Sequence, residues 1–250
     1  MAKQKSFLKF EGKIEDLSFY KGADGTYYVR SKGGVSKERI KNDPTFLRTR
    51  ENGAEFGSVA QAGKMFRRAI QNLISNVKDR TKTARMMQVL SEVKNQDTTS
   101  DRGLRNVHTG IQNPDGKKAF RLFDFNKNAP LDQVLKVSLT LDTTTGKVEI
   151  PEFVPNLNLS VPQGATDVGF QAARLRFDFE TGASELEVSN REMFVIDDTA
   201  ASVSLSWANT ATGPGLDYYF LKVSFYQETN SKLYPLHNGA HNALQLIEIK

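Results

Sequence analysis

The chain has 250 residues, of which 38% are hydrophobic and 25% charged, so it can bury the core of one large domain or two ordinary ones. It contains no cysteine, which excludes disulfides, thiolate zinc sites, iron–sulfur clusters and cysteine nucleophiles. Its net charge of +5 is unevenly distributed, because residues 1–130 carry 26 Lys and Arg against 14 Asp and Glu, whereas residues 131–250 carry 8 against 15.

The two halves of the chain thus carry net charges of +12 and −7. This asymmetry has three interpretations. The basic half can attract a polyanion, or the basic half of one copy can meet the acidic half of the next. The third interpretation is that the halves differ only in the charge of their solvated surfaces.

The sequence has no recognisable export or membrane segment. The N-terminus is basic, but no apolar run of signal-peptide length follows it, and no segment is apolar for long enough to span a membrane. We therefore expect a cytoplasmic location as synthesised and no membrane partner. An extracellular or particle location would require another export route or release by lysis.

The first predicted element is a β-hairpin over residues 12–32. Its turn is Gly22-Ala23-Asp24-Gly25, whose Asp-Gly pair suits the left-handed backbone of a tight turn between aromatic and β-branched strands. Tyrosines interleaved with Lys and Arg are typical of a surface that binds single-stranded nucleic acid. They also suit a hairpin that adds to a neighbour's sheet, or simple pairing of the tyrosines across the hairpin. The candidate residues for assembly or nucleic-acid contact are Tyr20, Tyr27, Tyr28, Arg30, Lys32, Arg39, Lys41, Arg48 and Arg50.

A helical region follows the hairpin. Asp43 and Pro44 are typical of an N-cap and a first helical residue. Apolar residues spaced three and four apart then predict helices over residues 54–77 and 80–94. The predicted apolar stripe of the first helix is Phe56, Val59, Phe66, Ile70, Leu73 and Val77.

From residue 120 onward the apolar period changes to two. Residues 95–118 are polar and rich in turn residues, which predicts a loop or a boundary before this change. Many short alternating strands separated by turns predict an antiparallel, immunoglobulin-like β-sandwich. The predicted fold class is therefore α+β, with a basic domain of hairpin and helices over residues 1–118 and an acidic β-sandwich domain over residues 119–250. Trp207 alternates with Val203 and Leu205, so we expect it in the sandwich core rather than in a carbohydrate- or peptide-binding groove.

No motif of catalysis or of cofactor binding is present. His237 and His241 have the i, i+4 spacing of a helical metal site, but Asn238-Gly239 between them predicts a turn. A calcium-like spacing of acidic and amide residues begins at Asp124, yet it lacks the glycine and the final glutamate that such a loop requires. We therefore predict a non-enzymatic protein with no catalytic residue, no metal and no cofactor.

One resemblance covers most of the chain. The residues Gly12-Lys13-Ile14, Leu17, Phe19-Tyr20, Gly25 and Tyr28-Val29-Arg30 resemble the opening module of uncharacterised, domain-of-unknown-function proteins of Bacteroidota. Those proteins also follow the module with a basic helical stretch and a β-rich C-terminal part. The resemblance implies a bacterial, non-enzymatic protein that is phage-related or forms particles, and it implies no site residue.

The sequence thus leads to two functional predictions. The first is a structural subunit that self-assembles into a filament, tube or shell, with copies of itself as partners. The alternative is a nucleic-acid-binding protein that uses the basic N-terminal half.

Overall fold

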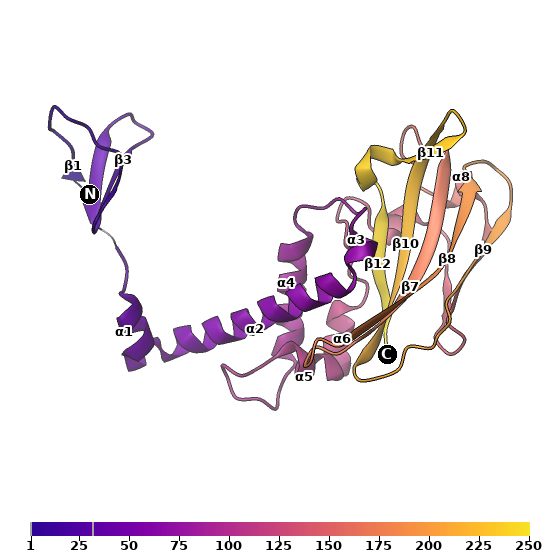
Figure 1. The fold of residues 1–250 in the computed structure, drawn as a ribbon, viewed down its shortest axis with the longest axis horizontal. Coiled ribbons are helices and arrows are strands. Elements are labelled where there is room, and N and C mark those ends of the chain that lie inside the picture. The colour runs from indigo at the N-terminus through magenta and orange to yellow at the C-terminus, as the bar shows by residue number, and fades with distance from the viewer. Residues whose placement is uncertain (1, 32) are drawn as a thin grey trace. The chain divides into compact units, whose positions relative to one another are not determined.

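The computed structural model describes residues 2–31 and 33–250 as a protein of mixed helix and sheet, with antiparallel strand pairing (Figure 1). Its contacts divide the chain into two compact units, an N-terminal unit, Met1–Glu51, and a C-terminal unit, Asn52–Lys250. The boundary predicted at residue 118 lies inside the C-terminal unit, because the helices and the large sheet of that unit share one apolar core.

The N-terminal unit contains a four-stranded sheet and two short helical segments. Its strands are β1 (Ala2–Lys3), β2 (Gly12–Ile14), β3 (Leu17–Lys21) and β4 (Tyr27–Ser31), in the order β1-β4-β3-β2. Strands β3 and β4 form the predicted hairpin, with Gly25 at φ 75° in its turn, but Gly12–Ile14, predicted in its first strand, forms the separate strand β2 that pairs with β3. Helix α1 (Lys37–Asn42) precedes η1 (Pro44–Phe46), which begins at Pro44 and is capped by Asp43 as predicted. None of the described residues in this unit is buried.

Five helices lie between Leu47 and Phe120. They are α2 (Leu47–Ala69, which begins in the N-terminal unit), α3 (Gln71–Ile74), α4 (Lys82–Asn95), α5 (Val107–Gln112) and α6 (Pro114–Phe120). Both predicted helices are present, but the first one breaks at Ile70, where φ is −105° and ψ is 20°, and continues as α3. The helix α2 also begins seven residues earlier than predicted, because η1 leads directly into it.

Residues 95–118, predicted to be a loop or a boundary, are irregular mainly over 96–106, because α5 follows and α6 begins at Pro114. Asn106 and Asn113 cap these helices through their side chains. Gly110 and Gly116, which look like turn residues in the sequence, permit close packing instead. A Cβ atom at Gly110 would lie 2.1 Å from the carbonyl oxygen of Val93, and one at Gly116 would lie 2.0 Å from that of Gly110.

The remaining elements form two antiparallel sheets. The five-stranded sheet has the order β11-β10-β7-β8, and β12 also pairs with β10. The three-stranded sheet has the order β5-β6-β9. The element bounds are α7 (Leu131–Val134), β5 (Thr140–Asp142), β6 (Lys147–Phe153), α8 (Pro155–Asn158), β7 (Asp167–Phe177), β8 (Ser184–Val195), β9 (Ala201–Ser206), β10 (Leu216–Thr229), β11 (Lys232–Pro235), η2 (Leu236–Gly239) and β12 (Ala243–Ile249).

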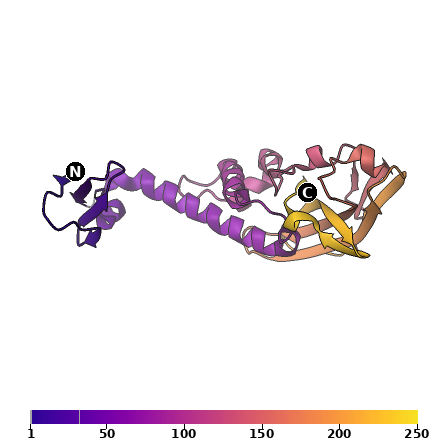
Figure 2. The ribbon, with the colours of Figure 1, turned by 90° about the horizontal axis from the view of Figure 1, so that it is seen from above.

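Two apolar cores lie on opposite faces of the five-stranded sheet (Figure 1, Figure 2). In one core, Phe66 of α2 contacts Phe177 of β7 and Tyr218 of β10, with ring centroids 5.3 Å and 5.1 Å apart. In the other core, residues of the three-stranded sheet pack against β7, β10 and β12, and Trp207 is buried there as predicted. The helices and the small sheet thus cover both faces of the large sheet.

Candidate interaction surface

The sheet of the N-terminal unit has two chemically different faces. Directly paired residues share a face, and successive residues of a strand alternate between faces. The register places Lys3, Lys13, Ser18, Tyr20, Tyr28 and Arg30 on one side, which we call the basic–aromatic face. It places Ile14, Leu17, Phe19, Tyr27 and Val29 on the other side, which we call the apolar face. The three tyrosines predicted as one group are therefore divided between the two faces.

Three side chains of the basic–aromatic face form a continuous stack. The paired rings of Tyr20 and Tyr28 are stacked, with centroids 5.8 Å apart and an angle of 26° between their planes. The guanidinium of Arg30 lies over the Tyr20 ring, 5.5 Å from its centroid. The Tyr28 hydroxyl donates to Oδ2 of Asp24 at 2.7 Å, which raises the pKa of Tyr28 and lowers the pKa of Asp24. The hairpin turn thus anchors one end of the stack, and Arg30 forms the other end.

A hollow of about 270 Å³ adjoins the Arg30 end of the stack. Its walls are Lys13, Glu15, Ser18, Arg30 and Gly33. Glu15 has a left-handed backbone with φ 48°, which is uncommon for a residue with a side chain. This tight connection between β2 and β3 brings one carboxylate to a hollow that also contains two cationic side chains.

The apolar face is an open surface. Ile14 and Leu17 are 55% and 43% exposed. Phe10 packs edge-on against Phe19 at 6.0 Å, yet 48% of Phe10 remains exposed. Lys21 lies over the Tyr27 ring at one end of this face, 5.6 Å from its centroid. No residue of this face is buried among the described part of the N-terminal unit.

The net charge of the chain belongs entirely to the N-terminal unit. Residues 1–51 contain 12 Lys and Arg and 7 Asp and Glu, which gives a net charge of +5. Residues 52–250 contain the remaining 22 basic and 22 acidic residues. Within the C-terminal unit, the excess of basic residues before residue 131 is thus balanced by the excess of acidic residues after it.

The predicted basic residues beyond the hairpin have partners in their own segment. Arg39 pairs with Asp43 at 3.1 Å, and Arg48 pairs with Glu51 at 2.9 Å. Arg50 donates from Nη1 to the backbone carbonyl of Asp43 at 3.0 Å. These arginines therefore stabilise the segment from α1 to α2, and the structure does not bring them to the basic–aromatic face.

Two of the predicted contact residues remain, both of them lysines. Lys41 is exposed on α1, and Lys32 lies outside the described residues. The list of candidates omitted Lys3, Lys13 and Ser18 of the basic–aromatic face, although Lys13 is one of the cations interleaved with the hairpin tyrosines in the sequence. Alternation within β3 could have identified Ser18, whereas the position of Lys3 depends on the register of β1, for which the sequence has no local signal.

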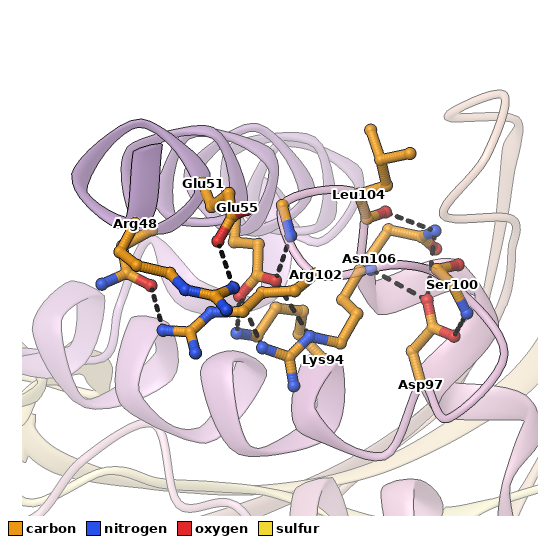
Figure 3. Close-up of polar contacts among 12 residues, drawn as sticks. Arg48, Glu51, Glu55, Lys94, Asp97, Ser100, Arg102, Leu104 and Asn106 are labelled. Atoms are coloured by element: carbon orange, nitrogen blue, oxygen red, sulfur yellow. Dashed lines mark hydrogen bonds and ion pairs between the residues drawn. The ribbon is translucent and has the colours of Figure 1, made fainter. Parts of the chain in front are cut away.

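A second polar cluster lies in the C-terminal unit around Glu55 (Figure 3). Glu55, which is 4% exposed, accepts hydrogen bonds from Nζ of Lys94, from Nε of Arg105 at 2.9 Å and from the backbone N–H of Gly103 at 2.8 Å. Burial raises the pKa of Glu55, but these hydrogen bonds outweigh burial and lower it to about 2. The groups satisfy one another, so the cluster is a structural ion network.

This network explains an error at the start of the predicted apolar stripe. Phe56 is 65% exposed, because Glu55 occupies the inward position on this turn of α2 and is held there by Lys94 and Arg105. The other large apolar residues of the stripe are confirmed as buried: Val59, Phe66, Ile70, Leu73 and Val77.

The weak metal motifs do not assemble into a site. The rings of His237 and His241 lie 5.3 Å apart. The Asp124 carboxylate accepts hydrogen bonds from the Leu131 N–H and from Nε2 of Gln245, both at 3.0 Å, and burial raises its pKa. Across residues 2–31 and 33–250, no three His, Cys, Asp or Glu side chains are grouped as metal ligands.

None of the helices within residues 2–31 and 33–250 combines sufficient length with sufficient apolar character to cross a bilayer. Comparison of the chain with family models, with curated proteins and with solved structures finds no match.

Proposed function

We propose that the chain is a non-enzymatic structural subunit that self-assembles into a filament, tube or shell. One observation carries the proposal, namely that none of the described residues of the N-terminal unit is buried. A sheet must bury its apolar face against another layer of secondary structure to be stable, and the described residues of this unit provide no such layer. The apolar face of this unit is therefore completed by another copy of the chain.

The contact joins two different surfaces. A contact between unlike surfaces propagates into a polymer, whereas a self-complementary contact closes a dimer. The C-terminal unit offers an unlike apolar surface on its terminal strand β8. There Val188, Met193 and Val195 lie on one face of the sheet and are 42%, 37% and 60% exposed. We assign the apolar face of one copy to this β8 surface of the next copy.

The C-terminal unit is the rigid body of this subunit. We infer a β-sandwich of the immunoglobulin-like kind, and its support is that side chains of the two sheets fill one core. The resemblance to uncharacterised Bacteroidota proteins supports a bacterial, phage-related origin. Synthesis in the cytoplasm and release within particles after lysis belong to the same proposal.

Light scattering and negative-stain microscopy of the nuclease-treated full chain test this function. We expect large particles in the absence of nucleic acid. Leu17→Asp places a charge on the apolar face and should leave only monomers. Ser18→Asp, one residue away on the opposite face, is the matched control and should still assemble. A wild-type chain that remains monomeric at high concentration would contradict the proposal, and so would equal loss of assembly in both variants.

A further inference from the structure

We propose that the basic–aromatic face of the N-terminal unit binds single-stranded nucleic acid, with one base stacked on the Arg30 guanidinium inside the adjoining hollow. This face is opposite to the apolar face that we assign to assembly. The inference rests on the proposed function only for the order of the sheet, and substitutions on the two opposite faces test the two proposals separately.

The stack of side chains provides the recognition of a base. Tyr28, Tyr20 and Arg30 follow one another, and Arg30 both covers the Tyr20 ring and lines the hollow. Proteins that bind single strands place unpaired bases on aromatic rings or on the planes of arginine guanidinium groups. A base that enters the hollow would extend this existing stack by one member.

The charges around the stack fit a phosphate backbone. Lys3, Lys13 and Arg30 share the face, and neither Lys13 nor Arg30 forms an ion pair with any described residue. The unit as a whole carries a net charge of +5. Two cations at the hollow and a third on β1 can therefore neutralise successive phosphates, which releases their counterions.

The Glu15 carboxylate at the hollow can contribute to recognition of the same base. Glu15 would repel a phosphate, but a carboxylate accepts hydrogen bonds from the exocyclic amino group of a base. Glu15 lines the hollow from the turn between β2 and β3. Stacking on Arg30 requires a base whose face is not covered by its neighbours in a duplex, so we infer a single strand.

Fluorescence anisotropy with a labelled 12-nucleotide single-stranded DNA of mixed sequence tests the inference. The titration uses the full-length wild-type chain as its parent, at a protein concentration at which light scattering gives the same state of assembly for every variant. Tyr20→Ala should weaken binding by roughly 5- to 100-fold, which corresponds to the loss of one stacking ring. Tyr27→Ala, a tyrosine of the same sheet on the opposite face, is the matched control and should change affinity by less than about 2-fold.

The salt dependence and the duplex give two further results. The double variant Lys13→Ala with Arg30→Ala should lower the slope of log affinity against log salt by about two. The parent should bind the single strand at least ~10-fold more tightly than the duplex of the same sequence. Equal effects of Tyr20→Ala and Tyr27→Ala, or equal binding of duplex and single strand, would overturn the inference. Circular dichroism of each variant establishes that the comparison is made between folded proteins.

Discussion

Both units are built on antiparallel sheets, but only the sheet of the C-terminal unit is covered on both faces. In β7, Ala173, Leu175 and Phe177 face the helices, while Val168 and Phe170 face the three-stranded sheet, and all are at most 1% exposed. In β3, neither the apolar nor the polar set of residues has a covering layer within its own unit. In both sheets, successive side chains of a strand point to opposite faces. The sheets differ in whether another layer of secondary structure covers those faces, and this decides which sheet is stable alone.

The largest expected effect comes from dividing the chain inside the C-terminal unit. We expect a fragment of residues 52–250 to unfold cooperatively on heating. A fragment of residues 119–250 should lack a cooperative transition, because it exposes the face of β7 and β10 that Phe66 and its neighbours cover. Circular dichroism and calorimetry of the two fragments measure the difference. A cooperative transition in residues 119–250 would show that the helices are dispensable and that the boundary predicted from the sequence is the physical one.

A charge on the buried face of α2 should have the next largest effect. Ile70 is 0% exposed, so Ile70→Asp buries an unpaired charge and should lower the free energy of unfolding by ~3–5 kcal/mol. Phe56→Asp, on the exposed side of the same helix, should change it by less than ~0.5 kcal/mol. Urea denaturation of both variants gives the two values. Similar values for the two substitutions would mean that the stripe does not face the core.

Removal of the Glu55 carboxylate should destabilise the C-terminal unit about as much as Ile70→Asp does, or slightly less. Glu55→Ala leaves Lys94 and Arg105 without their buried partner, which costs ~3 kcal/mol for a broken buried ion network. Asp101→Ala, an exposed carboxylate in the loop between α4 and α5, is the control and should have little effect. Chemical denaturation at neutral pH measures both, and a neutral result for Glu55→Ala would show that solvent already compensates these cations.

The same carboxylate predicts a smaller, pH-dependent effect. The pKa of Glu55 falls from 4.5 to about 2 on folding, so the unfolded state binds its proton more readily than the folded state. The stabilisation from Glu55 is therefore fully present above pH 4.5 and is lost as the pH falls toward 2. Unfolding free energies measured across this range should decrease more steeply for the wild-type chain than for Glu55→Gln. Parallel curves would contradict the lowered pKa.

Local sequence signals predicted the elements whose stability is local. Asp24-Gly25 indicated the hairpin turn, Asp43-Pro44 indicated the start of a helical segment, and alternation indicated the strands. Alternation in β4 could also have separated Tyr27 from Tyr28, since adjacent strand residues point to opposite faces.

Other features depend on contacts between distant residues and could not be predicted. Gly110 is required by the approach of the Val93 carbonyl, so its helix was mistaken for a loop. Glu55 lies inside only because Lys94 and Arg105, 39 and 50 residues away, bind it. The hollow beside Arg30 likewise requires the pairing of β2 with β3, which brings Lys13 opposite Ser18.

Hydrogen exchange at two protein concentrations tests most directly whether another copy completes the N-terminal unit. In dilute monomer, the amides of β3 and β4 should exchange rapidly, whereas those of β7 and β10 should be protected by the two cores. After assembly at high concentration, β3 and β4 should become protected, and β7 and β10 should keep their protection. Strong protection of β3 and β4 in the dilute monomer, unchanged on concentration, would contradict the account, because it would mean that this sheet is stable without a partner.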